Sequence, residues 1–189
     1  DGASVVVTSG FVRKMGDAFK EFVNVKYSSR KALVSEYADS KNSGVTVGGK
    51  YAGMKPILIP QMDYCTNDIW ELAAAYGTDN NFPVVLRCSY GAGSIAIVTI
   101  PDNMGDLYHY PVEVLNVIRG LLSKEMPVVL DGPSQVQLFA YDNDKVIVRS
   151  DLPYAESVGL KVADGVKAVK DLVKGTEIPV ADGKVTLEM

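Results

Sequence analysis

The sequence predicts an α/β domain over residues 1–125, followed by a small all-β, sandwich-like domain over residues 126–189. Two observations predict this division. In the first part, runs of β-branched residues alternate with stretches whose apolar residues recur at helical spacing. After Pro127 the spacing changes to the period of two that is typical of half-buried strands. With 189 residues and 47% hydrophobic content, the chain can bury one substantial core or two small ones.

The N-terminal segment is predicted to be a strand followed directly by a helix. Residues 4–8 form a continuous run in which every residue after Ser4 is β-branched, as in strands that are covered on both faces of a parallel sheet. Apolar residues then recur at helical spacing from Phe11 to Val23, and Ser9 is in position to cap the helix. An interior strand needs neighbours, and little sequence precedes this one. We therefore expect the domain to be truncated at its N-terminus.

The middle of the first domain is predicted to contain short strands and one short helix. The strands are expected at residues 31–37, 45–47 and 56–60. Asp68 and Glu71 have the spacing of a capping box, so a helix is expected to begin there. Its apolar stripe extends to Tyr76, and Gly77 provides a stop.

A hairpin and a helix close the first domain. Residues 83–89 and 94–100 are rich in β-formers and flank a glycine turn, which predicts the hairpin. An amphipathic helix follows from Val112 to Leu122, with Pro111 at a permitted first-turn position. The strands of the second domain are then expected at residues 128–130, 136–141, 146–149, 158–162 and 185–187.

The charge pattern argues against nucleic acid and membrane as partners, and the two cysteines allow two interpretations. Lys and Arg total 19 against 23 Asp and Glu, and they are dispersed, so neither nucleic acid nor membrane is an expected partner. The longest apolar runs are far shorter than a bilayer span. Cys65 and Cys88 could pair, but free, half-buried thiols are favoured because unpaired cysteines tend to be buried.

Three stretches carry a resemblance to a known family: residues 2–10, with glycine, an apolar strand and Thr-Ser-Gly; residues 82–94, with the glycine hairpin; and residues 127–148, with a turn at 141–144. They resemble the C-terminal region of large glycoside-hydrolase-type proteins, such as bacterial β-galactosidases with a trimerisation domain. In these proteins a class I glutamine-amidotransferase-like domain precedes a β-sandwich. The resemblance implies an amidotransferase-like (flavodoxin-like) sheet with flanking helices, of which the first half, with the nucleophile turn, is missing.

The chain lacks a complete catalytic set at the level of sequence. A working amidotransferase needs a cysteine at a strand-to-helix elbow, activated by a histidine, and neither Cys65 nor Cys88 has that context. His109 falls near the His-Pro-Glu step of the family, but a surface or capping role is favoured because no nucleophile accompanies it. We expect no catalytic residue, no cofactor and no metal, since no metal-ligand spacing is present.

One group of loop residues is a candidate ligand or interface site. It comprises carboxylates, aromatic residues and the histidine: Asp63, Tyr64, Trp70, Asp102, Asp106, Tyr108 and His109. Facing carboxylates could hydrolyse glycosides, and aromatic side chains could line a ligand cleft at the strand ends. In the competing interpretation, Asp68 caps a helix, Asp102 forms part of a turn, and the aromatic residues contact another protein or domain.

The leading hypothesis is a non-catalytic accessory or oligomerisation region of a carbohydrate-active, glycoside-hydrolase-like protein. Its expected partners are an upstream catalytic domain or other subunits. An alternative is a glycan-binding module that uses the Tyr64, Trp70 and Tyr108 loops, with carbohydrate as the partner. A third hypothesis is a hydrolase that uses the loop carboxylates.

Overall fold

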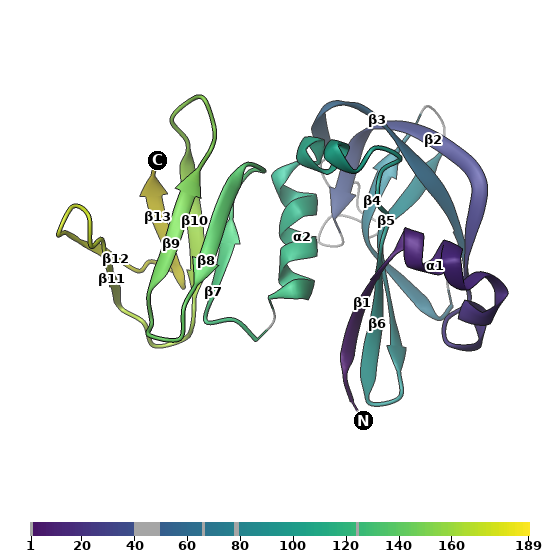
Figure 1. Ribbon diagram of the computed structural model, residues 1–189, viewed down its shortest axis with the longest axis horizontal. Helices are drawn as coiled ribbons and strands as arrows, with labels where there is room; N and C mark the ends of the chain where they lie inside the picture. The colour runs from purple at the N-terminus through teal and green to yellow at the C-terminus, as the bar shows by residue number, and fades with distance from the viewer. Residues whose placement is uncertain (1, 40–49, 66, 78–79, 124) are drawn as a thin grey trace. The chain divides into compact units, whose positions relative to one another are not determined.

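The computed structural model describes residues 2–39, 50–65, 67–77, 80–123 and 125–189. It divides into two compact units, Asp1–Leu121 and Leu122–Met189. Strands make up 52% and helices 17% of the structure, so the predicted flavodoxin-like α/β fold is wrong (Figure 1). The strand that was predicted at residues 45–47 lies outside the described residues.

A six-stranded sheet forms the frame of the first unit, in the order β1-β6-β5-β4-β2-β3. Its strands are β1 (Ser4–Thr8), β2 (Val25–Asp39), β3 (Tyr51–Tyr64), β4 (Ile69–Tyr76), β5 (Asn81–Tyr90) and β6 (Gly93–Val98). Only β1 and β6 pair in parallel; the other neighbours are antiparallel. Irregularities in the register interrupt the β2–β3 and β4–β5 pairs, and such bulges bend strands, which fits the curled sheet of Figure 1.

Strand β1 lies at an edge of this sheet, so its predicted interior position is wrong. Within the described residues it pairs with β6 alone, and Val5 is 46% exposed. A β-branched run fits any pleated surface, and it does not indicate how many neighbours the strand has. The expectation of an N-terminal truncation therefore loses the argument on which it rested.

Strand β4 corresponds to the segment predicted as a helix, and that prediction is wrong. β4 pairs with β5 on one side and with β2 on the other. Ala73, Ala74 and Ala75 are all buried there. Alanine, leucine and glutamate favour helices locally, but hydrogen bonding on both edges and burial on both faces override that weak preference. Asp68 consequently caps no helix.

Four helical segments accompany the sheet: α1 (Ser9–Met15), the 3₁₀ helices η1 (Gly16–Glu21) and η2 (Met104–His109), and α2 (Val112–Leu122). The predicted helix over residues 11–23 is thus divided at Gly16, where φ is 58°. Thr8 rather than Ser9 caps α1, because its Oγ1 accepts a hydrogen bond from Phe11 N at 3.3 Å. The α2 and hairpin predictions are confirmed. None of these helices has the length and apolar character needed to cross a bilayer.

Two hydrophobic cores stabilise the first unit. One contains Tyr37 and Val85 and is covered by residues of α2, such as Val114. The other contains Leu86 and is covered by residues of α1 and η1, such as Phe19. Since Val85 and Leu86 are consecutive in β5, and successive side chains of a strand point to opposite faces, the two cores lie on opposite faces of the sheet.

The second unit is built from strands in all of its described regular elements. These are β7 (Val128–Asp131), β8 (Val136–Ala140), β9 (Val146–Ser150), β10 (Ser157–Val162), β11 (Ala168–Lys170), β12 (Glu177–Pro179) and β13 (Lys184–Glu188). They form the three-stranded sheet β13-β10-β7 and the pairs β8-β9 and β11-β12. The five predicted strands are present, whereas β11 and β12 were not predicted. Val158, Leu160 and Val185 are at the centre of one small core.

Candidate functional site

The residues predicted as one loop cluster lie on several different elements. Asp63 and Tyr64 end β3, and Trp70 lies within β4, where it is 78% exposed. Asp102 follows β6, and the remaining three residues, Asp106, Tyr108 and His109, lie on η2. Trp70 lies in the segment that was predicted as a short helix and that forms strand β4. The seven residues therefore do not lie together in loops, as was predicted.

Asp102 is held on the sheet by an ion pair. Its Oδ2 lies 2.7 Å from Lys31 Nζ, and its backbone N donates to Leu58 O at 2.9 Å. Gln61 Nε2 donates to Lys31 O at 3.1 Å, so the strand that carries the lysine is also fixed. This carboxylate is therefore paired with a cation of the same chain.

Asp106 is held in the same way and is more deeply buried. Its side chain is only 14% exposed, and its Oδ1 lies 2.9 Å from Lys55 Nζ and 3.8 Å from His109 Nε2. Asn103 begins η2 by accepting from Gly105 N at 3.1 Å, which places Asp106 one turn before His109. We use the name Asp106 cluster for these two separate sets of ionic contacts taken together; its members are Lys31, Lys55, Asp102, Asp106 and His109.

A tyrosine pair supports the Asp106 cluster from the core. Tyr37 is fully buried, and its ring meets Tyr110 edge-on with 5.4 Å between the centroids. Burial and the nearby charge of Asp106 raise the pKa of Tyr37 above its ordinary value. A Cβ at Gly53 would lie 2.8 Å from Tyr37 Cε2, so only glycine leaves room for the ring. The Tyr37 hydroxyl and His109 Nδ1 are buried without a partner in the described residues.

Glu71 is a half-buried residue with one buried carboxylate oxygen, and the sequence did not indicate it as a site residue. Asn81 Nδ2 donates to its Oε2 at 3.3 Å, and Tyr64 also hydrogen-bonds to the carboxylate. Its Oε1 is buried and has no partner in the part of the chain that the structure describes. Burial raises the pKa of Glu71, and the two hydrogen bonds oppose that shift only in part.

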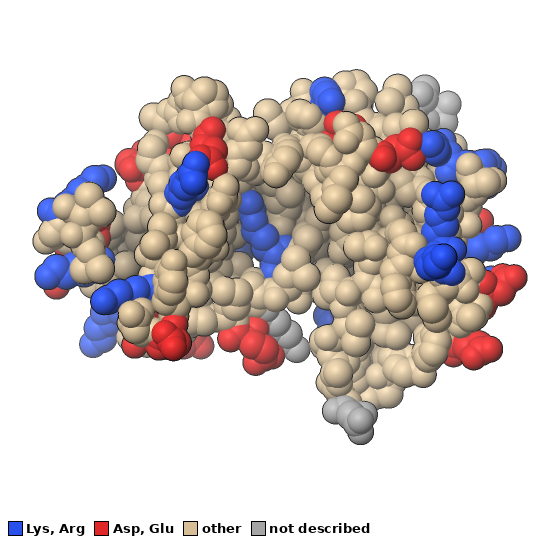
Figure 2. Space-filling view, in the orientation of Figure 1, with Lys and Arg blue, Asp and Glu red and all other residues tan. Residues whose placement is uncertain are grey.

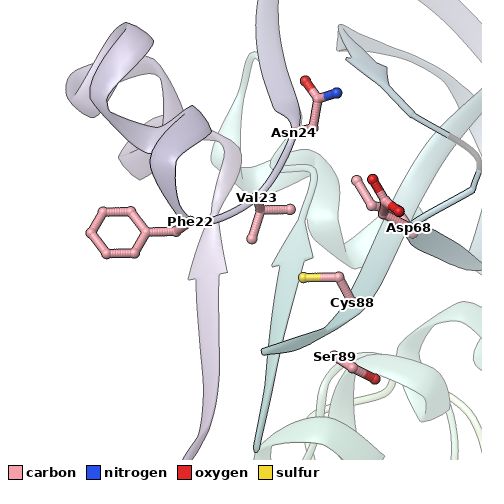
Figure 3. A pocket seen from close by; sticks show the side chains of 7 residues that line it. Phe22, Val23, Asn24, Asp68, Cys88 and Ser89 are labelled. Carbon is pink, nitrogen blue, oxygen red and sulfur yellow. The ribbon is translucent and has the colours of Figure 1, made fainter. Parts of the chain in front are cut away.

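A second candidate site is a pocket of about 400 Å³ in the first unit (Figure 3). We call it the Cys88 pocket; its lining residues are Phe22, Val23, Asn24, Asp68, Ile69, Cys88 and Ser89. Figure 3 shows the Cys88 sulfur directed toward Val23, whereas the Phe22 ring extends away from the other labelled side chains. The segment after η1, the start of β4 and the end of β5 form this pocket. Because they are distant in sequence, no local pattern could have predicted it.

The thiol in this pocket is not arranged as a nucleophile. Both cysteines are free, and Cys88 is buried whereas Cys65 is half-buried. Burial, with a smaller contribution from the charge of Asp68, raises the pKa of Cys88. Nucleophilic cysteines need the opposite shift, because the thiolate is the reactive form.

The charged residues and potential metal ligands point to no further centre. Basic and acidic side chains are interspersed on the face shown in Figure 2. Within the described ranges, no group of three or more His, Cys, Asp or Glu side chains could hold a metal ion.

Comparison with known families finds a match for each of the two units. Residues 127–186, less than half of the chain, match the model of a family described as "Probable glycosyl hydrolase, C-terminal domain", which supports an association of the second unit with glycoside hydrolases. Residues 1–103, more than half of the chain, match the model described as "Uncharacterized protein SSO3021, second domain". The chain therefore belongs to that family. No curated protein matches it in sequence.

Solved structures with similarity to the chain include three β-galactosidases. That from Bacillus circulans sp. alkalophilus is 17% identical over 99% of this chain and 29% of its own, with a TM-score of 0.43. The cold-adapted enzyme from Rahnella sp. R3 is 17% identical over 100% and 29%, with a TM-score of 0.44. Gan42B, a GH42 β-galactosidase from G. stearothermophilus, is 13% identical over 100% and 26%, with a TM-score of 0.42. The chain thus spans less than a third of these proteins.

The resemblance stated from the sequence is confirmed in its glycoside-hydrolase part only. The match of residues 127–186 supports it. The amidotransferase-like part of the resemblance is not confirmed, because the described sheet of the first unit is mostly antiparallel, with one parallel strand pair.

Proposed function

We propose that this chain is a non-catalytic accessory region of a carbohydrate-active protein and that it contacts a catalytic domain or other subunits. The observation that carries the proposal is the match of residues 127–186 to the C-terminal domain of probable glycosyl hydrolases. The proposal places the chemistry in another part of the parent protein.

The state of the carboxylates supports a non-catalytic role. Glycoside hydrolysis needs one carboxyl group as a proton donor and another as a base or nucleophile, both facing the sugar. Asp102 and Asp106 instead face Lys31 and Lys55 at 2.7 and 2.9 Å. Asp63 is an exposed residue of β3. These pairings and this exposure support a structural or surface role for the three carboxylates.

The proposal is tested on the parent protein with its natural catalytic region. We expect turnover of aryl glycosides to be unchanged when Asp63, Asp102 and Asp106 are together replaced by Asn. Loss of turnover in a folded triple variant would instead support the hydrolase hypothesis. Thermal unfolding of each variant provides the control for folding.

The contact role needs its own measurement. Hydrogen exchange of the parent protein and of the isolated chain should differ at the residues that meet another domain or subunit, because contact protects amides from solvent. Light scattering of the parent gives its subunit number. A monomeric parent whose amides exchange as in the isolated chain would remove the contact role.

The glycan-binding alternative retains support from two of its three aromatic residues, Trp70 and Tyr108, since Tyr108 is 56% exposed on η2. Trp70 is 78% exposed on β4, and an exposed indole can stack on a sugar face. Tyr64, by contrast, is half-buried and hydrogen-bonds to Glu71. Titration with oligosaccharides tests the alternative, which predicts that Trp70→Ala abolishes binding.

A further inference from the structure

The Cys88 pocket has a predominantly polar lining around a small apolar floor. Val23, Ile69 and Cys88 are each about 5% exposed or less and form the floor. Asn24, Asp68 and Ser89 also line the pocket, and all three are exposed. A hydrogen bond of 2.7 Å from Val25 N to Val23 O closes a tight turn with Asn24 at its tip. The turn therefore fixes the backbone of Asn24 at the rim.

The polar side chains of the rim are available to a ligand. Within the described residues, the side chains of Asn24, Asp68 and Ser89 make no hydrogen bond or ion pair with the protein. Together they offer a carboxylate acceptor, an amide that both donates and accepts, and a hydroxyl group. This set is complementary to several neighbouring hydroxyl groups, each of which can donate and accept.

The charge of the pocket limits the class of ligand. Asp68 is the only charged group among the described lining residues, so an anion would meet no cation there. One carboxylate without further acidic or histidine ligands is also a poor site for a metal ion. A neutral polar molecule with one apolar face fits both the floor and the rim.

We propose that the Cys88 pocket binds a neutral pyranose sugar, with the apolar face of the ring on Val23 and Ile69 and its hydroxyl groups toward Asn24, Asp68 and Ser89. The volume of about 400 Å³ is sufficient, since small-molecule pockets span roughly 300–1,000 Å³. Phe22 and Tyr90, whose ring centroids are 6.1 Å apart, are exposed beside the rim and provide aromatic surface for a second sugar unit. The choice of sugar among neutral ligands rests on the proposed role in a carbohydrate-active protein.

The test is a titration of the isotope-labelled chain with methyl pyranosides of galactose, glucose, mannose and xylose, followed by NMR. We expect one of them to shift the amides of residues 22–24, 68–69 and 88–89, with a Kd of about 1–10 mM, as suits an open pocket with few contacts. Asp68→Asn and Asn24→Ala should each weaken binding at least about tenfold, which corresponds to the loss of one good hydrogen bond.

Matched variants separate the pocket from other surfaces. Asp164→Asn makes the same change at an exposed carboxylate of the second unit and should leave binding unchanged. Trp70→Ala should also leave it unchanged, because Trp70 does not line the pocket. Thermal unfolding of each variant shows whether it is folded.

Three results would overturn the proposal: no pocket shifts with any of the four sugars, equal binding by folded Asp68→Asn and Asn24→Ala variants, or loss of binding in Trp70→Ala alone. The accessory role itself is tested by turnover and exchange in the parent protein. Failure of the pocket and failure of the accessory role are therefore distinguishable.

Discussion

The Asp106 cluster and the Cys88 pocket are two polar regions of the same unit, and they differ in where their polar groups find partners. In the Asp106 cluster, Asp102 and Asp106 are paired with lysines of the same chain. In the Cys88 pocket, the polar side chains of the rim have no partner in the described residues. Satisfied groups stabilise a fold, whereas unsatisfied groups around an apolar floor are free to bind a ligand. The difference shows that the presence of carboxylates and aromatic residues does not by itself indicate a site.

The largest expected effect comes from removing the support of the Asp106 cluster. Tyr37→Ala should lower the free energy of unfolding by about 3–5 kcal/mol, because it empties a fully buried aromatic position. Tyr37→Phe should be neutral or slightly stabilising, since the buried hydroxyl group has no partner. Chemical denaturation measures both. A Phe variant as unstable as the Ala variant would mean that the hydroxyl group does have a partner.

The two ion pairs should differ in strength. Asp106→Asn should cost about 1 kcal/mol, because its side chain is mostly buried beside Lys55. Asp102→Asn should cost less than about 0.5 kcal/mol, because the Asp102 side chain is 41% exposed and water screens its pair with Lys31. Denaturation at low and high salt checks this order, and equal costs for the two variants would contradict it.

Glu71 extends the comparison to a half-buried carboxylate without a cationic partner in the described residues. Burial raises its pKa in the folded protein above the ordinary value of 4.5, so its contribution to stability is present below pH 4.5 and is lost as the pH rises through the folded pKa. Glu71→Gln should therefore raise the midpoint of thermal unfolding at pH 7 but not at pH 4. A stabilisation that is equal at both pH values would assign the effect to packing rather than to charge.

The smallest expected effect concerns the cysteines and involves no loss of stability. Cys65 should react with iodoacetamide at least about tenfold faster than Cys88 at pH 8, because Cys88 is buried and its pKa is raised. Peptide mapping after brief labelling compares the two rates. Faster labelling of Cys88 would show that the pocket opens more readily than the structure indicates.

Much of the local structure could be predicted from the sequence. The glycine hairpin of β5 and β6, helix α2 and the five longer strands of the second unit have patterns that are complete within a few residues. The candidate site could not be predicted in the same way. The Cys88 pocket joins three separate segments, and the predicted loop residues are distributed over β3, β4, η2 and the segment after β6.

The sequence by itself determined the alternation of buried and exposed side chains in the second unit, the glycine turn of the β5–β6 hairpin and the bounds of α2, because these depend on spacing along the chain. Only the tertiary structure decided that β1 lies at an edge and that residues 69–76 form a central strand. A strand's position depends on hydrogen bonds to segments far away in sequence, and these can outweigh the helix preference of Ala and Leu. The same long-range pairing decided which carboxylates meet a lysine and which remain unpaired at the rim of a pocket.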